Sequence, residues 1–183
     1  MIRPWETLAG DVVTSTEIFE LRRVKRRSGQ TGVVAEFHIV QFPAWVNVIA
    51  LTPENEVILI RQYRHGTGEV TLEIPGGIVD SGESPAEAAA RELVEETGYT
   101  GSELELLGRV RPNPAIQTNS CYTYLISSVQ RTRRQSLERN EEIEVELRSL
   151  SSVQTAIRTG EITHALVIAA FYFLEHSGRM RRI

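Results

Sequence analysis

The sequence predicts an α/β fold whose interleaved strands and helices suit a mixed sheet, extended at the N-terminus by an antiparallel β segment. Three observations lead to this prediction. Strand-like and helical segments are interleaved without the regular alternation of an all-parallel sheet. One segment, Pro85–Thr97, carries both start and stop signals of a helix. Two strand-like segments near the N-terminus are joined by a short turn that contains glycine.

The N-terminal part is expected to be a hairpin, with strands at Glu17–Arg26 and Val33–Phe42 and a turn at Ser28–Gly32. Further strands are expected at Trp45–Leu51, Val57–Tyr63, Val70–Ile74, Leu104–Arg111, Tyr122–Ser127 and Ile143–Leu147. Two helices are expected to close the fold, Ser152–Thr159 before Gly160 and His164–His176 before Gly178.

The helix at Pro85–Thr97 rests on the signals at its two ends. Ser84 can cap it, Pro85 suits the first helical position, and Glu87 lies three residues after the cap, which completes a capping box. Gly98 is typical of the residue that follows a helix. These signals predict both the start and the end of the helix.

The same helix places three carboxylates together. Glu92, Glu95 and Glu96 stand at positions i, i+3 and i+4, and therefore share one face. Like charges at this spacing cost a helix roughly 0.2–0.5 kcal/mol per pair. A divalent cation would remove that cost, and hard oxygen ligands suit Mg²⁺ or Mn²⁺. We therefore expect Glu92 and Glu96 to be metal ligands, with Glu95 as a third, direct or through water.

The stretch from Gly77 to Tyr99 resembles the Nudix box, whose fixed positions are filled here by Gly77, Glu83, Arg91, Glu92, Leu93, Glu95, Glu96 and Gly98. Only Tyr99 departs from it, where the family more often has an aliphatic residue. The resemblance implies a Nudix-type α/β/α sandwich that hydrolyses a pyrophosphate bond with Mg²⁺ or Mn²⁺. It also implies that the Gly76 carbonyl is a metal ligand, and that Glu83 and Arg91 tie the loop to the helix as a structural pair.

The general base has two possible sources. Some Nudix enzymes use a glutamate of the box, for which Glu95 is the candidate, whereas enzymes that act on ADP-ribose use one from a later loop. Here Glu141 and Glu142 follow a polar stretch that we expect to be mobile, Gln130–Arg139. Glu141 is the first choice and Glu142 the second. An ordinary solvated role is the alternative for both.

Residues around the box resemble the branch of the family that cleaves ADP-ribose and nucleoside diphosphate sugars. Arg64 would approach a phosphate and Glu73 the ribose or the base, unless the two simply pair with each other across neighbouring strands. Asn113 and Asn119 lie in an amide-rich loop and offer hydrogen bonds to a sugar or a base. GDP-mannose and other nucleotide sugars therefore stay open as substrates beside ADP-ribose.

Domain organisation follows from the same resemblance. We expect residues 1–42 to be a β extension that forms a homodimer, and residues 43–183 to be the Nudix domain with its box at 77–99. A formal net charge of −4 argues against nucleic acid as a partner. Three basic runs, at 22–27, 131–134 and 179–182, are expected to be solvated surface. Cys121 stands alone and no apolar run is long enough for a membrane span, so a cytoplasmic location is expected.

The function expected from the sequence is Mg²⁺-dependent hydrolysis of a nucleoside diphosphate sugar to a nucleoside monophosphate and a sugar phosphate. One alternative is a Nudix hydrolase for another nucleoside diphosphate derivative, such as a dinucleoside polyphosphate or an oxidised nucleotide. A second alternative, from a different class, is a Nudix-fold module that binds a nucleotide sugar without cleaving it. The complete set of box glutamates weighs against that module, because a sensor has no need of a self-repelling acidic face.

Overall fold

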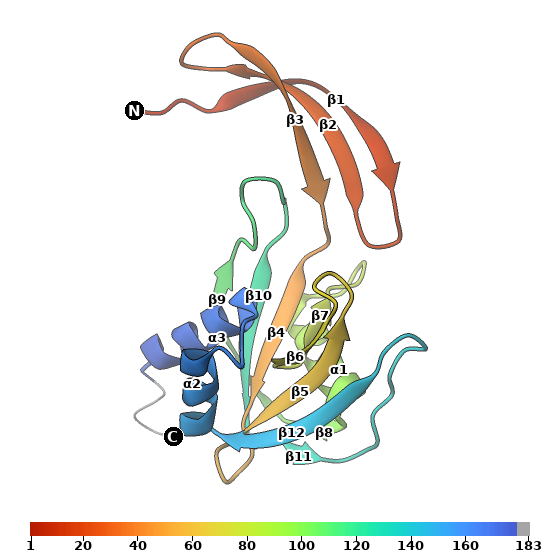
Figure 1. Cartoon of the computed structure of the whole chain (residues 1–183), viewed down its shortest axis with the longest axis vertical. Helices are drawn as coiled ribbons and strands as arrows, with labels where there is room; N and C mark the ends of the chain where they lie inside the picture. The colour runs from red at the N-terminus through yellow and green to blue at the C-terminus, as the bar shows by residue number, and fades with distance from the viewer. Residues whose placement is uncertain (179–183) are drawn as a thin grey trace. The chain divides into compact units, whose positions relative to one another are not determined.

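The computed structural model describes residues 1–178 of the chain, which form two compact units (Figure 1). The first unit comprises Met1–Pro43 and Arg111–Ser120, and the second comprises Ala44–Val110 and Cys121–Ile183. The basic run of Arg179, Arg181 and Arg182 lies outside the described residues.

The first unit is a three-stranded antiparallel sheet in the order β1-β2-β3. Its strands are β1 (Trp5–Ser15), β2 (Glu20–Ser28) and β3 (Val34–Gln41). The hairpin of β2 and β3 confirms the sequence prediction, but β1 was not predicted. All its side chains are exposed, so burial imposes no alternation of apolar and polar residues on its sequence.

Charged side chains and one returning segment hold this sheet together. Arg23 and Arg27 of the basic run in β2 form ion pairs with Asp11 (3.0 Å) and Glu6 (3.1 Å) of β1. Residues 111–120 return to lie beside β3, where the Val40 amide donates to the Ile116 carbonyl at 2.8 Å. The amide-rich loop is therefore part of the first unit.

The second unit contains the predicted mixed sheet in two main parts. One has the order β7-β4-β10-β9, with β4 and β10 parallel and the other pairs antiparallel, and the second has the antiparallel order β12-β5-β6. A short pair, β8 with β11, completes the set. The strands are β4 (Trp45–Ala50), β5 (Glu56–Arg64), β6 (Glu69–Glu73), β7 (Gly76–Ile78), β8 (Tyr99–Thr100), β9 (Glu103–Val110), β10 (Cys121–Ser127), β11 (Gln130–Arg131) and β12 (Ile143–Ser149).

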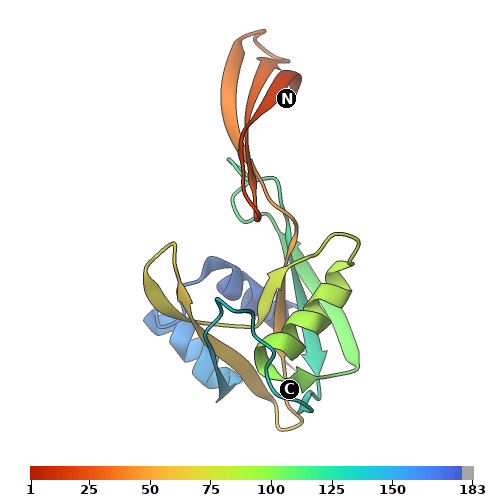
Figure 2. The same ribbon diagram turned by 90° about the vertical axis from the view of Figure 1, so that its right-hand side faces the viewer.

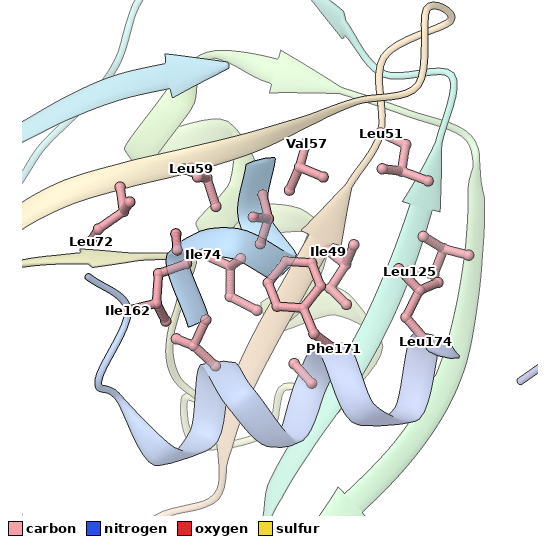
Figure 3. Packing of buried hydrophobic residues seen from close by; sticks show 14 residues of the cluster. Ile49, Leu51, Val57, Leu59, Leu72, Ile74, Leu125, Ile162, Phe171 and Leu174 are labelled. Carbon is pink, nitrogen blue, oxygen red and sulfur yellow. The ribbon is translucent and has the colours of Figure 1, made fainter. Parts of the chain in front are cut away.

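Helices cover both faces of these sheets, which confirms the sandwich. Figures 1 and 2 show α1 (Pro85–Thr97) on one side, and α2 (Leu150–Thr159) with α3 (Ala165–His176) on the other. The side chains of β4 alternate between the two layers: Val48 packs with the cluster at α1, and Ile49 packs with the cluster at α2 and α3 (Figure 3). Within residues 1–178 no helix has both the length and the apolarity to cross a membrane.

Helix α1 begins and ends where its sequence predicts. The Ser84 hydroxyl accepts from the Glu87 amide while the Glu87 carboxylate accepts from the Ser84 amide, so the capping box is complete. At the other end Gly98 has a left-handed φ of 78°, and its amide donates to the Val94 carbonyl. Because Ala88, Ala89 and Leu93 of α1 are buried against the sheet, the acidic face has a fixed position.

Gly98 and Gly160 provide a matched pair for testing how the end of α1 is held. Both end a helix with nearly equal positive φ, but a Cβ on Gly98 would come within 2.2 Å of the Arg133 carbonyl oxygen, whereas one on Gly160 would meet no atom within 4 Å. We predict that Gly160→Ala lowers the free energy of unfolding by about 1 kcal/mol, from backbone strain alone. Gly98→Ala is expected to cost about 2–4 kcal/mol, since the clash adds to the strain. Urea denaturation of both variants measures the difference, and equal losses would contradict this account.

Candidate active site

The acidic face of α1 lies against the loop that precedes it. The Gly76 amide donates to Glu96 Oε2 at 2.9 Å, and the Glu96 side chain is only 3% exposed. A Cβ on Gly77 would come within 2.3 Å of Glu92 Oε1, so only glycine leaves that carboxylate its place. The Glu95 side chain is more open, at 41% exposed. Two of the three carboxylates are thus enclosed by backbone, and the third faces solvent.

Burial makes the charges of these two carboxylates costly. It raises the pKa of Glu92 to about 7, against the opposing effect of Arg91. It also raises the pKa of Glu96 well above its usual range; the Gly76 amide opposes this shift, and the charges of Glu92 and Glu141 add to it. A buried carboxylate pair of this kind is favourable only with a compensating positive charge.

Arg91 supplies part of that charge. Its guanidinium binds both oxygens of Glu83, at 2.9 and 3.0 Å, and it also donates to Glu92 at 2.9 Å, to Glu95 at 3.0 Å and to the Ile78 carbonyl at 3.0 Å. The structure thus brings Glu83 and Arg91 together between the loop and the helix. Arg91 does not reach Glu96, and no cationic side chain of the described residues forms an ion pair with that carboxylate.

The donor set around Glu92 and Glu96 fits a hard divalent cation. Both carboxylates are enclosed, and the hydrogen bond from Gly76 leaves most of the lone pairs of Glu96 available. Among residues 1–178 no three histidine, cysteine, aspartate or glutamate side chains are already gathered tightly enough to hold an ion by themselves. The ion would therefore need further oxygen ligands from backbone, water or a bound phosphate. The roles of Glu95 and of the Gly76 carbonyl as ligands stay predictions.

Arg64 and Glu73 form the pair that the sequence left as an alternative. Arg64 Nε and Nη2 donate to the two oxygens of Glu73, each at 2.7 Å. The Thr71 hydroxyl donates to the same carboxylate at 2.6 Å, and His164 Nε2 lies 3.9 Å from it. Burial raises the pKa of Glu73, but the hydrogen bonds and charge of Arg64, together with the Thr71 hydroxyl, bring it below its usual value. Arg64 is thereby held at the end of β5, where its charge is also felt by Glu96.

The loop that carries Glu141 and Glu142 makes defined contacts in its first half. The Gln135 amide nitrogen donates to the carbonyls of Glu96 (2.6 Å) and Ile143 (3.1 Å). The expected mobility of the loop stays a prediction. Glu141 is half-buried, and its carboxylate accepts from the Glu138 amide at 2.9 Å. Its charge raises the pKa values of both Glu92 and Glu96. Glu142 is exposed.

A cavity of about 570 Å³ opens between this loop and the end of β5. Its lining includes Arg64 on one side and Glu141 with Glu142 on the other. Gln62 also lines it, and the buried side-chain nitrogen of Gln62 has no hydrogen-bond partner among residues 1–178. The cavity therefore offers a guanidinium and carboxylates to a polar ligand.

Asn113 and Asn119, the other residues predicted to bind substrate, belong to the first unit. The Asn113 carbonyl accepts from the Gln117 amide at 2.7 Å and so closes a turn. Asn119 is nearly buried, at 5% exposed, and neither atom of its side-chain amide has a hydrogen-bond partner in the described part of the chain. Such an orphaned amide is unusual, since buried polar groups are nearly always paired. A contact with substrate stays a prediction for both residues.

Three residues of the site were not predicted from the sequence: Thr71, His164 and Gln135. Thr71 carried a weak signal, because it lies two residues before Glu73 on the same strand and therefore on the same face. His164 caps α3 through its side chain, a role that histidine rarely signals in a sequence. Gln135 lies in a polar stretch, where nothing distinguishes it from a solvated side chain.

Arg91→Lys tests the importance of the guanidinium geometry. A lysine has three donors on one nitrogen and cannot bind Glu83 through two parallel bonds while also reaching Ile78, Glu92 and Glu95. We expect the free energy of unfolding to fall by about 2 kcal/mol. The matched control is Arg158→Lys on α2, where a single hydrogen bond at 3.3 Å is at stake and the expected change is below about 0.5 kcal/mol. A loss at Arg91 no larger than at Arg158 would refute the structural role of the pair.

Comparison with known proteins identifies relatives of similar sequence and structure. The NUDIX domain family model matches residues 42–171. The chain is 28% identical to an ADP-ribose pyrophosphatase of Bacillus subtilis (93% of this chain, 92% of the other) and 30% identical to one of Mycobacterium tuberculosis (90% and 80%). A crystal structure of an ADP compounds hydrolase superposes with a TM-score of 0.86 at 20% identity, over 99% of this chain and 97% of the other. The chain therefore belongs to the Nudix family and is a Nudix hydrolase.

Proposed function

We propose that this Nudix hydrolase cleaves the pyrophosphate bond of nucleoside diphosphate sugars, with ADP-ribose as the first candidate, and that it requires Mg²⁺ or, in its place, Mn²⁺. The observation that carries the proposal is the enclosed pair of carboxylates, Glu92 and Glu96, with the charge of Glu141 acting on both. Such a pair is unfavourable unless a positive charge, here a divalent cation, balances it. The divalent ion that it would hold supplies positive charge to the phosphate oxygens and lowers the pKa of a bound water.

Arg64 is the residue that we assign to the diphosphate. Its guanidinium lines the cavity at the end of β5, and it is fixed by two hydrogen bonds to Glu73. A planar guanidinium with further donors suits a phosphate oxygen. Glu73, which is nearly buried, would then serve mainly to orient Arg64, and its proposed contact with the ribose or the base is secondary.

Glu141 is the residue that we assign as general base. In the proposed reaction water adds to one phosphorus, the bridging P–O bond breaks, and the proton of the water passes to a Glu141 oxygen. The products are a nucleoside monophosphate and a sugar phosphate. Glu141 is favoured over Glu142 because its charge is felt at both buried carboxylates, whereas Glu142 is exposed. Glu95 is the less favoured choice, since Arg91 already binds its carboxylate.

The substrate class is supported by the relatives that span almost the whole chain. The proteins of Bacillus subtilis and Mycobacterium tuberculosis are both named ADP-ribose pyrophosphatases. A mouse ADP-sugar pyrophosphatase is 42% identical over 71 residues, 39% of this chain and 32% of its own length. GDP-mannose and other nucleotide sugars come second, followed by dinucleoside polyphosphates and oxidised nucleotides.

A panel of substrates tests the proposal directly. ADP-ribose, ADP-glucose, GDP-mannose, a diadenosine polyphosphate and an oxidised nucleoside triphosphate are each incubated with Mg²⁺ or with chelator, and the products are identified by chromatography. We expect AMP and ribose 5-phosphate from ADP-ribose with Mg²⁺, and no turnover with chelator. Faster cleavage of the polyphosphate or the oxidised nucleotide would favour the enzymatic alternative. Binding without any turnover would favour the sensor.

Glu96→Gln separates chemistry from folding in the same assay. The change keeps the shape of the side chain and removes a buried charge, so we expect an unchanged fold and a kcat lowered by roughly 10²- to 10⁴-fold. Mg²⁺ should also raise the melting temperature of the unaltered protein more than that of the variant, because a bound ligand stabilises the folded state. The control is Glu54→Gln in an exposed turn, for which neither quantity should change. Near-normal kcat in Glu96→Gln would refute the assignment.

We also propose that the first forty-two residues form a homodimer. In the described part of the first unit Val24 is the only buried apolar side chain, at 7% exposed. Large apolar side chains of its sheet are open to solvent, namely Trp5, Leu8, Val12, Val13, Val34 and Phe37. A three-stranded sheet with so little core of its own is stabilised by burying such side chains, and a second copy of the chain would bury them.

Light scattering tests the dimer at micromolar concentration. We expect a mass near twice 20.6 kDa for the whole chain. Val12→Glu in the exposed strand β1 should shift the mass toward that of the monomer, because it places a charge among the apolar side chains. Thr14→Glu in the same strand is the polar control. A monomeric mass for the unaltered protein would rule out the proposal.

A further inference from the structure

The loop between β11 and β12 is attached to the C-terminal end of α1 at several points. The amides of Thr132 and Arg133 donate to the Gly98 carbonyl at 3.0 and 3.3 Å, and the Ser136 amide donates to the Glu95 carbonyl at 2.8 Å. In the sequence, Gln135 lies between Arg133 and Ser136. A helix end leaves four carbonyls without partners inside the helix, and this loop satisfies two of them, those of Glu95 and Glu96.

Gln135 makes the central connection because its side chain reaches two elements at once. Its Nε2 donates to the Glu96 carbonyl of α1 at 2.6 Å and to the Ile143 carbonyl of β12 at 3.1 Å. A carboxamide has two N–H donors, so both bonds form together. The side chain thus joins the last turn of the acidic helix to the first residue of β12.

The residues between these two connections include Glu141. Gln135 fixes the beginning of the segment, Ile143 fixes its end, and the turn at Glu138 and Glu141 closes on itself through two hydrogen bonds. The loop backbone also lies close to α1 at Gly98, where the Arg133 carbonyl leaves no space for a side chain. This second contact fixes the distance between loop and helix without involving Gln135. The position of Glu141 relative to Glu92 and Glu96 therefore depends on the contact that Gln135 makes.

We propose that Gln135 is a positioning residue of the active site: it holds the loop that carries Glu141 against α1, so that the proton acceptor and the carboxylates of the helix keep one geometry. This inference rests on the proposed function, in which a glutamate of this loop accepts the proton. It assigns no contact with substrate to Gln135 itself. A displacement of about 1 Å at such a group can cost up to about 10²-fold in rate.

Gln135→Met tests this inference, since methionine matches the length of glutamine and removes both hydrogen bonds without adding charge. We expect kcat for ADP-ribose to fall by about 10- to 100-fold with KM changed less than about threefold, because binding is retained and only the geometry of the reacting groups is disturbed. Gln135→Asn, which keeps the amide but is too short to reach both carbonyls, should show the same split. Gln154→Met on the exposed face of α2 is the matched control and should leave both constants unchanged.

A double-mutant cycle with Glu141→Gln distinguishes positioning from mere destabilisation. If Gln135 acts through Glu141, adding Gln135→Met to Glu141→Gln lowers kcat by no more than about twofold further. Multiplied losses would overturn the inference, as would a normal kcat in both Gln135 variants beside a slow Glu141→Gln. If kcat is normal in Glu141→Gln, the base assignment fails, and the inference fails with it. Thermal unfolding of each variant, measured beside these rates, verifies that the enzymes compared are folded at the assay temperature.

Discussion

The repulsion between two enclosed carboxylates, Glu92 and Glu96, is the constraint on which the rest of the second unit depends. Both side chains are buried, which destabilises their charged forms, and they lie one helical turn apart. If stability alone decided the residue types, burial at positions 92 and 96 would favour apolar side chains. The complete capping box, the buried alanines of α1 and the loop backbone at Gly76 all stabilise this helix in one place despite the repulsion.

Positive charge around the pair is arranged in two ways. Arg91 neutralises part of it directly and ties the preceding loop to α1 through Glu83. The charge of Arg64 also acts on Glu96, but its guanidinium forms its hydrogen bonds with Glu73 and not with Glu92 or Glu96. Within residues 1–178 no cationic side chain forms an ion pair with Glu96, and in the proposed function this carboxylate binds the divalent ion instead. In the proposed function, substrate choice falls to residues outside the helix, namely those that line the cavity at the end of β5 and the loop with Glu141.

The sequence predicts the parts of this architecture whose signals are local. Helix α1 is found with its correct ends because Ser84, Glu87 and Gly98 each carry a cap signal, and the strands β4 and β5 are found because each contains a short apolar run, at 48–50 and 57–60. Strand β1 was missed because its exposed side chains follow no alternation, and β7 because three residues with two glycines resemble a loop. The connections of Gln135, Thr71 and His164 could not be predicted, since they depend on which residues distant in sequence meet in space. The same reason kept the pairing of Arg64 with Glu73 an open alternative.

Glu92 and Glu96 are proposed to form the site of a divalent ion. The most direct measurement is the anomalous scattering of Mn²⁺ in crystals of the protein grown or soaked with that ion, with and without an ADP-ribose analogue whose bridging oxygen is replaced by a methylene group. We expect an anomalous peak within bonding distance of oxygens of both carboxylates. A fully occupied peak elsewhere, with no peak at these two side chains in the presence of the analogue, would contradict it.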